Sequence, residues 1–268
     1  MADKRVMGKC HICGRYRKLS FEHIPPQSAG NVHKHLLFTA EELLKPGSPM
    51  HTSMDNSVQD LKQAHVHYKQ LQRGAGLTTI CEECNNYLGQ NYVTEFVNLY
   101  SAIESWCTGP DAPVYKSGTH GEIPGISFTV NQFKPLAFFK QVISNFATCL
   151  PYGKLPGVDY YLTHRENTHF PKYYKLRLMI WPKRPERIAH AGWSKVFVGR
   201  GLYYKTAKLI IPPFVFNLYD TRNNSLPPSP LGGITAMSDV PFGETRSTTF
   251  SLPLLSDEQV KLDGFLFT

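Results

Sequence analysis

The sequence predicts an α+β protein, in which a small metal-binding module of about 110 residues precedes a mixed α+β domain. Two C-x-x-C pairs and short alternating segments fall within residues 1–110, and residues 111–268 mix strand-like and helix-like patterns. The composition, with 41% hydrophobic and 12% aromatic residues, is that of a globular chain. It excludes an intrinsically disordered protein.

The sequence shows no signal for a membrane or for export. No apolar run approaches the roughly 20 residues that a membrane-spanning helix needs. Residues 1–5 are charged and no apolar segment follows them, so we expect no secretion signal. We therefore expect a soluble, cytoplasmic protein with no membrane partner. In that reducing compartment its six cysteines are expected to bind metal or to pack in the core.

The formal charge of +8 is concentrated in one part of the chain. Residues 151–220 contain 12 Lys and Arg but only 4 Asp and Glu. A phosphate backbone is one partner that fits such a surface. A solvated face on an ordinary basic protein explains the same charge equally well, so charge alone leaves both interpretations open.

The elements of the first module follow from local patterns. Residues 19–24 alternate apolar and polar side chains, as a half-buried strand does, and two prolines end the strand. An insert at residues 32–73 follows, with apolar residues at helical spacing over 61–71. Residues 77–80 form a short β-type run, and a helix is expected over 82–106.

The second domain is predicted to contain both helix and sheet. Residues 126–130 alternate as a strand does, and residues 135–146 fit an amphipathic helix with proline in its first turn. Three further segments are expected to be strands of a mixed sheet: 174–181, 195–198 and 202–216.

Four of the cysteines form two C-x-x-C pairs, and their residues are Cys10, Cys13, Cys81 and Cys84. Zinc prefers four soft ligands in a tetrahedron, and a two-residue gap lets both sulfur atoms of a pair face one ion. A redox C-x-x-C would normally occur once, inside a βαβ pattern. We therefore predict a structural zinc site. Cys107 and Cys149, at predicted helix ends, are expected to pack in the core.

Further polar residues accompany the cysteine pairs. Glu22 and His23 are followed by Pro26, and Asn85 comes directly after the second pair. The combined pattern, C-x-x-C, then (D/E)-H-x-x-P, then C-x-x-C-N, resembles the zinc-containing, four-cysteine branch of the HNH (ββα-metal) endonucleases. The resemblance covers roughly residues 8–98, with the insert unmatched. It implies a zinc-stapled module in which two strands and a helix hold one catalytic divalent ion.

The resemblance also implies roles for single residues. His23 would be the general base, and Glu22 and Asn85 would be oxygen ligands of the catalytic ion. Oxygen donors of this kind suit Mg²⁺ or Mn²⁺. Each residue also has a simpler interpretation: a Glu-His pair on a strand is usually surface, and Asn85 can cap the helix that begins near it. Asn86 competes with Asn85 for the ligand role.

The chain departs from the family pattern in two places. The family's middle Asn lies a few residues before the second pair, but residues 73–80 contain no Asn. Asn31, in the loop after the first strand, is the candidate to replace it. The acidic ligand is Glu, which reaches one methylene further than the commoner Asp. His33 and His35 are near enough in sequence to line the same cleft, although exposed histidines on an inserted lobe explain them as well.

The sequence thus predicts a metal-dependent endonuclease that hydrolyses phosphodiester bonds, with double-stranded DNA as its expected partner. Similar stand-alone proteins are typically bacterial or phage-borne, which implies a role in antiviral defence or restriction. One alternative is a non-catalytic, zinc-dependent nucleic-acid-binding protein on the same scaffold. Another is an adaptor that works with a partner subunit. Residues 111–268 are expected to contact nucleic acid or to form a homo-oligomer.

Overall fold

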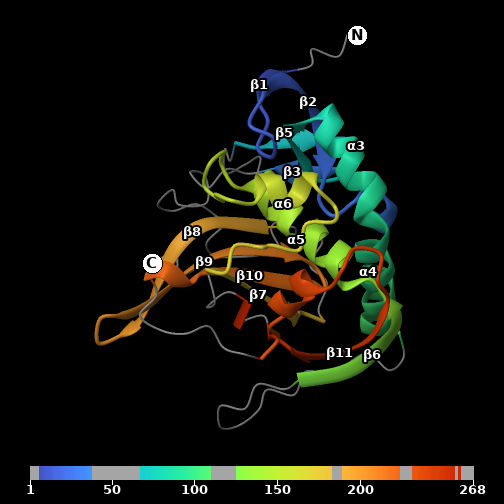
Figure 1. The fold of residues 1–268 in the computed structure, drawn as a ribbon, viewed down its shortest axis with the longest axis vertical. Coiled ribbons are helices and arrows are strands. Elements are labelled where there is room, and N and C mark those ends of the chain that lie inside the picture. Colours follow the sequence, from blue (N-terminus) through green and yellow to red (C-terminus); the bar gives the residue numbers. More distant parts are fainter. Residues whose placement is uncertain are drawn as a thin grey trace.

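Figure 1 shows the fold of the 268-residue chain, a computed structural model. The structure describes residues 6–37, 67–109, 125–182, 189–223, 231–256 and 259–260. These residues form an α+β arrangement, as the sequence predicts. A three-stranded sheet lies at one end of the molecule, beside the helix α3, and a four-stranded sheet lies below it in the view of Figure 1.

The three-stranded sheet contains the predicted strands of the first module. Its members are β1 (Met7–Lys9), β2 (Tyr16–His23) and β5 (Gly76–Cys81), all antiparallel, in the order β1-β2-β5. The expected strands at 19–24 and 77–80 are confirmed, and β2 begins earlier than expected. The chain passes from the last residue of β5 directly into a helix, so β2, β5 and that helix adjoin one another.

The helical structure expected over 82–106 is confirmed, but the segment forms two helices instead of one. These are α3 (Glu82–Asn91) and α4 (Val93–Thr108), which meet at Tyr92. The Tyr92 ring is buried, and its hydroxyl donates a hydrogen bond of 2.9 Å to the Leu162 carbonyl. This distant contact anchors the residue at which the helix axis changes direction.

The described ends of the insert pair with each other. β3 (His35–Leu37) and β4 (Lys69–Leu71) form a two-stranded antiparallel sheet. The helix expected over 61–71 is therefore wrong at residues 69–71, and residues 61–66 lie outside the described residues. Strand pairing supplies the backbone hydrogen bonds of β4, and a helical spacing of apolar residues cannot reveal such a distant partner.

The four-stranded sheet is the largest β-element of the described chain. Its strands are β7 (Tyr174–Ile180), β8 (Ala189–Gly199), β9 (Leu202–Ile211) and β10 (Phe214–Asp220). The order is β7-β10-β9-β8 and every neighbouring pair is antiparallel, so the mixed sheet that the sequence suggested is wrong. The run 202–216 is two strands, because Pro212 and Pro213 lack the amide hydrogens that would continue β9.

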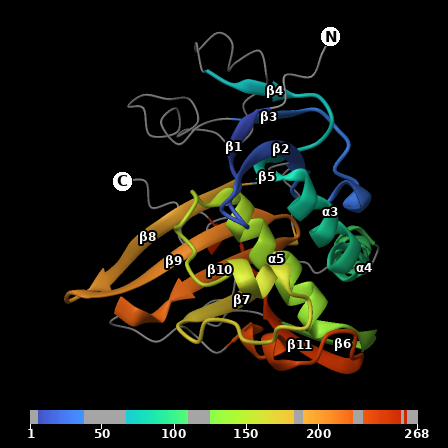
Figure 2. The same cartoon turned by 45° about the horizontal axis from the view of Figure 1, so that its top comes forward.

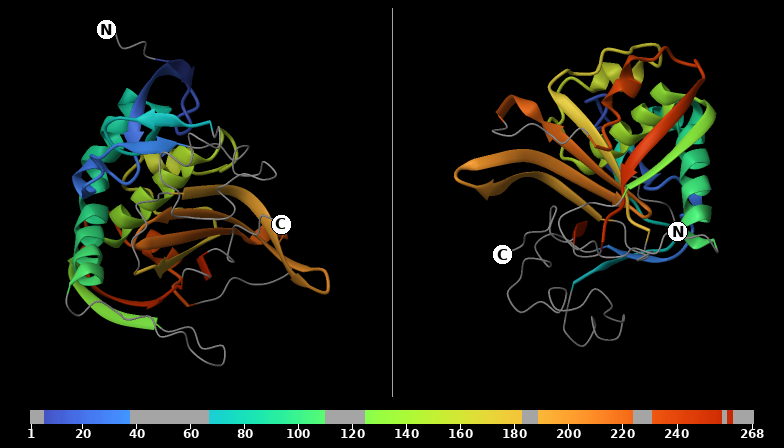
Figure 3. Two further views of the ribbon diagram at one scale, coloured as in Figure 1. Left: turned by 180° about the vertical axis from the view of Figure 1, so that it is seen from behind. Right: turned by 90° about the horizontal axis from the view of Figure 1, so that it is seen from below.

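The remaining elements complete the second half. β6 (Gly125–Phe133) pairs with β11 (Arg246–Pro253) at the end of the molecule away from β1 and β2, as Figures 1 and 3 show. The expected strand at 126–130 is therefore confirmed. The short helix α6 (Asp159–Thr163) follows the helix α5 (Pro135–Cys149), which lies against one face of the four-stranded sheet (Figure 2).

The helix α5 is buried on all sides rather than amphipathic, since every residue from Pro135 to Thr148 is buried. Its Phe138 stacks on Phe96 of α4 with ring centroids 6.0 Å apart, and it meets Phe214 of β10 at 6.5 Å. One hydrophobic core therefore crosses residue 110. The division into domains at 1–110 and 111–268 stays a prediction.

The most unusual residue of this core is Lys140, whose side chain is 0% exposed. Its ammonium group donates hydrogen bonds to three backbone carbonyls, those of Tyr161 at 2.8 Å, His164 at 2.7 Å and Arg165 at 3.0 Å. The carbonyls belong to α6 and to the turn after it. Lys140 therefore ties the end of α6 to the centre of the core.

We expect Lys140→Met to lower the free energy of unfolding by about 3 kcal/mol, because three backbone carbonyls lose a charged donor and the Tyr161 carbonyl is buried. Urea unfolding followed by circular dichroism measures the change. Lys134→Met is the matched control, since Lys134 is exposed and immediately precedes the same helix. Equal stability of the two variants would contradict a structural role for the Lys140 ammonium.

Candidate metal centre and neighbouring polar site

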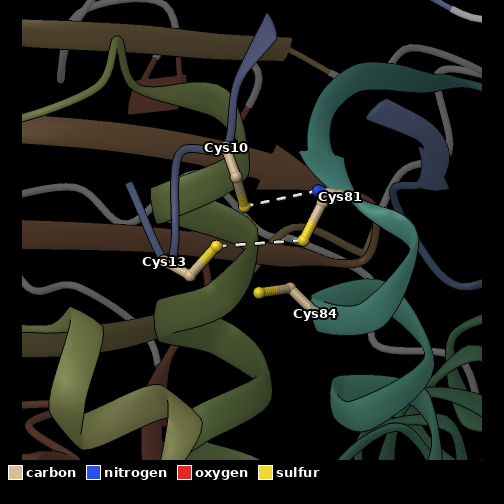
Figure 4. A group of neighbouring side chains, drawn as sticks. All are labelled: Cys10, Cys13, Cys81 and Cys84. Carbon is tan, nitrogen blue, oxygen red and sulfur yellow. Dashed lines mark hydrogen bonds between the residues drawn. The ribbon is translucent and has the colours of Figure 1, made fainter. Parts of the chain in front are cut away.

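The four cysteines of the C-x-x-C pairs gather at one point of the first module. Cys10 and Cys13 lie in the turn between β1 and β2, Cys81 ends β5, and Cys84 lies in the first turn of α3. Their sulfur atoms all lie within 4.8 Å of one another. Figure 4 shows the four side chains pointing toward a common centre from these two segments.

The spacing of the sulfur atoms suits a tetrahedral metal ion. A zinc–sulfur distance of about 2.3 Å places the sulfur atoms of a tetrahedron about 3.8 Å apart. The Cys13 and Cys81 sulfur atoms are 3.8 Å apart, and the Cys81 amide donates to the Cys10 sulfur at 3.3 Å. The cluster can therefore hold a metal such as zinc, and it ties the β1–β2 turn to the start of α3.

The electrostatics of the cluster also favour a cation. A hydrogen bond from Cys84 lowers the pKa of Cys10 to about 4. The same hydrogen bond, together with burial, raises the pKa of Cys84, and burial raises the pKa of Cys13. In the absence of a cation, Cys10 is thus favoured as a thiolate while Cys13 and Cys84 keep their protons, because negative charges this close repel one another. A divalent cation removes that conflict.

A second group of polar residues lies further along β2, where the strand faces the loop before β5. His23 ends β2, and its Nε2 atom lies 2.7 Å from the Arg73 carbonyl oxygen. The Phe21 ring meets the imidazole edge-on at 4.9 Å. These contacts hold the His23 ring on the same face of β2 as the Phe21 ring.

The loop that receives His23 is held by Asn31, which is buried. The Asn31 amide donates to the carbonyls of Pro25 and Ala75, both at 2.7 Å, and its oxygen accepts from the Ala75 amide at 2.7 Å. Gly74 has a φ of 90°, and a Cβ there would meet the Asn31 carbonyl oxygen at 2.2 Å, so only glycine fits. Asn31 therefore ties the loop after β2 to the segment that leads into β5.

Glu22 precedes His23 and is buried, with 8% of its surface exposed. Burial raises the pKa of its carboxyl group to about 7. Within the described residues no group donates a hydrogen bond to it. A β-bulge separates the pairing of Ser20 from that of Glu22, whose partner on β5 is Leu77. The structure thus holds the Glu22 carboxyl group in a poorly solvated place, where no described residue donates to it.

Asn85 reaches β2 from the first turn of α3. Its amide nitrogen donates to the Ser20 hydroxyl at 3.1 Å and to the Phe21 carbonyl at 3.2 Å. Because a carbonyl only accepts, the nitrogen must face β2, and the amide oxygen points elsewhere. Asn86 is exposed on the same helix. The structure therefore brings Asn85, rather than Asn86, against the strand that carries Glu22 and His23.

The two histidines of the insert lie differently. The His33 side chain is exposed, and its carbonyl accepts from the Gly74 amide at 2.8 Å, so its backbone borders the loop that receives His23. His35 belongs to β3, opposite Leu71. Sequence reasoning missed Ser20, which accepts from Asn85, and the Arg73 carbonyl. A backbone oxygen leaves no trace in a sequence pattern, and a serine on a strand carries little signal.

The fold and the site together define an α+β chain with a four-cysteine cluster that can hold a metal ion. No protein-family model, curated protein or solved structure matches the chain. Among the described helices, none combines the length and the apolar character needed to cross a membrane.

Proposed function

We propose that this protein is a metal-dependent endonuclease of the HNH type that hydrolyses phosphodiester bonds of double-stranded DNA. The observation that carries the proposal is that Asn85 of α3 donates hydrogen bonds to β2, the strand that carries Glu22 and His23, while the four-cysteine cluster lies at the start of the same helix. A protein that used the cysteines only as a scaffold would need none of these three side chains.

His23 is suited to act as a general base. The Arg73 carbonyl can only accept, so in the neutral imidazole Nε2 carries the proton and Nδ1 keeps its lone pair. That lone pair can take a proton from a water molecule that attacks a phosphodiester. General base action of this kind contributes about 10²–10⁴ in rate.

Two different metal ions fit the donor sets. The four thiolate ligands suit structural zinc, whereas the Glu22 carboxylate and the Asn85 amide oxygen are hard donors that suit Mg²⁺ or Mn²⁺. A divalent ion bound there would offset charge on the phosphate oxygens and on the leaving oxygen. Glu22 supplies the negative charge of this pair, and the hydrogen bonds from the Asn85 nitrogen to β2 orient its oxygen.

Asn31 acts in this proposal as a positioning residue. It binds the backbone of Ala75 on both sides and so fixes the loop whose Arg73 carbonyl holds the base. The role is that of the middle Asn in the HNH pattern, supplied here from the loop after the first strand instead of the segment before the second cysteine pair.

Incubating the purified protein with supercoiled plasmid DNA and Mg²⁺ or Mn²⁺ tests the proposed function. The expected result is nicked and linear plasmid from the wild-type chain and intact plasmid from His23→Ala. Intact plasmid from both proteins with either metal would reject the endonuclease. Cleavage by both would show that His23 is not the base. A protein that binds DNA without cutting it would instead support the non-catalytic alternative.

We expect Asn31→Ala to lower kcat by about 10- to 100-fold, a typical cost of losing a residue that orients a catalytic group. KM and the zinc content should stay near the wild-type values, because the Asn31 side chain contacts the backbone of Pro25 and Ala75 and none of the four cysteines. Steady-state cleavage of a labelled duplex separates kcat from KM, and thermal unfolding reports any loss of stability.

The matched control for this prediction is Asn86→Ala, which removes an exposed amide from α3. Its kcat should equal that of the wild type. A large loss in Asn86→Ala combined with full activity in Asn31→Ala would show that both residues have been assigned wrongly.

A further inference from the structure

The strands β8 and β9 extend past the rest of the four-stranded sheet. The pairing of β10 with β9 ends at Tyr219 and Thr206, whereas β8 and β9 remain paired from Lys195 and Lys205 to Gly199 and Leu202. Residues 195–205 therefore form a two-stranded ribbon, and no other strand of the described residues pairs with it. Figures 1 and 3 show this ribbon projecting from the body of the molecule. We call residues 195–205 the projecting ribbon.

The projecting ribbon is rich in positive charge, and among the described residues Asp220 is the one acidic side chain that pairs with it. Lys195 lies directly opposite Lys205, and Arg200 is exposed at the tip. The sequence contains no Asp or Glu from residue 187 to residue 219. The next acid, Asp220, is buried and accepts from Lys205 at 3.1 Å and from Arg222 at 2.7 Å. It is therefore already neutralised.

Two features of the projecting ribbon cost stability in the isolated protein. Lys195 lies opposite a second lysine, whose charge is only partly offset by Asp220, and a two-stranded ribbon in water is at best marginally stable. Phe197 is also 65% exposed and Leu202 is 40% exposed, so apolar surface faces water. A partner that supplies negative charge and covers this apolar surface would offset both costs.

The charged and aromatic side chains share one face of the projecting ribbon. Directly opposed residues of antiparallel strands point to the same side, which places Lys195 and Lys205 with the Phe197–Tyr203 pair. The Phe197 and Tyr203 rings are 5.7 Å apart, and the Lys195 ammonium lies 4.9 Å from the Tyr203 ring centroid. This face combines cations with two neighbouring aromatic rings.

We propose that the projecting ribbon is a DNA-binding element that lies in a groove of duplex DNA. Strands in a sheet are about 4.8 Å apart, so a two-stranded ribbon fits the major groove, which is about 12 Å wide. Lys195 and Arg200 contact phosphates, while Phe197 and Tyr203 pack against base edges. This inference rests on the proposed function for the identity of the partner, and it adds a second contact distant from the proposed catalytic residues.

Charge argues against a second copy of this chain as the occupant. The strand β8 is an edge strand, and pairing with its own copy would bring Lys195 and Arg200 toward the same cations of the other chain. DNA presents the opposite charge along the whole ribbon. Duplex DNA therefore satisfies both the cations and the apolar residues.

Fluorescence anisotropy of a short labelled DNA duplex, titrated with the full chain without added Mg²⁺ or Mn²⁺, tests the proposal. We expect Phe197→Ala to weaken binding by about tenfold. Lys195→Ala should weaken it and lower the slope of log K against log salt by about one, as loss of one phosphate contact does. The matched controls are Tyr160→Ala, whose ring is 61% exposed, and Lys172→Ala, an exposed lysine outside the ribbon. Both should bind as the wild type does.

Several outcomes would overturn the proposal: equal affinity of the ribbon and control variants, no binding by the wild type, or a dimer that Phe197→Ala dissociates while DNA affinity is unchanged. Sedimentation velocity detects the dimer. The plasmid assay reports separately on the proposed function. A chain that cleaves plasmid but binds DNA normally in both ribbon variants would refute the ribbon and retain the endonuclease. DNA binding that depends on the ribbon, in a chain that does not cleave plasmid, would retain the ribbon proposal and refute the endonuclease.

Discussion

Cys13→Ser is expected to abolish zinc binding at the four-cysteine cluster and to lower the melting temperature sharply. Structural zinc contributes on the order of 10 kcal/mol in small modules. Loss of even about 5 kcal/mol lowers the melting temperature of a chain this size by about 10–20 °C. The effect should extend beyond the β1–β2 turn, because Cys10, Cys81 and Cys84 belong to the common hydrophobic core. Elemental analysis and thermal unfolding measure the two quantities.

Cys149→Ser is the matched control for the cysteine variant. Cys13 and Cys149 are both partly exposed, and only Cys13 belongs to the cluster. The control should keep one zinc per chain and a melting temperature well above that of Cys13→Ser. A chelator should then bring the wild type toward the Cys13→Ser value. If both variants retain zinc and melt together, the cluster is not a structural metal site.

The second large effect is expected for His23→Ala, which should reduce plasmid cleavage by about 10²- to 10⁴-fold. The loss should appear in kcat at saturating metal and DNA, because the imidazole acts on the attacking water rather than on substrate binding. Zinc content and melting temperature should change little, since the ring lies at the end of β2 and its described contacts are to Arg73 and Phe21. A gel assay over a range of enzyme concentrations measures the rate.

Glu22→Gln provides a complementary variant for the catalytic ion. It retains the size of the side chain but removes the charge, so we expect it to raise the Mg²⁺ or Mn²⁺ concentration needed for half-maximal cleavage. Saturating metal should therefore rescue Glu22→Gln in part and His23→Ala not at all. Identical metal dependence of Glu22→Gln and the wild type would remove Glu22 from the set of ligands.

Local sequence patterns predicted those parts of the fold that depend on near neighbours. Two-residue gaps between cysteines predicted the cluster, and alternation predicted β2, β5 and β6. Proline at the first turn predicted the start of α5. Each signal acts within a few residues, because a C-x-x-C turn, a pleat or a helix start is a local property of the backbone.

The wrong predictions concern elements that depend on residues far away in the sequence. The break at Tyr92 depends on a hydrogen bond to Leu162, and the strand β4 depends on pairing with β3. The polar residues of α5 suggested a solvated face, but Lys140 finds its three carbonyls on α6 and the turn beyond it. A periodic pattern shows which side chains are polar and which are apolar. It does not show which distant group forms a hydrogen bond with a polar side chain.

The sequence by itself determined the four cysteines as a metal-binding set and named Glu22, His23 and Asn85 as candidates. Only the tertiary structure decided their arrangement. It places the Asn85 nitrogen on β2, buries Glu22 with no donor among the described residues, and joins Asn31 to Ala75 across 44 positions of the chain. Such contacts form only when β2, β5 and α3 pack together, because each links groups that no local pattern brings into reach.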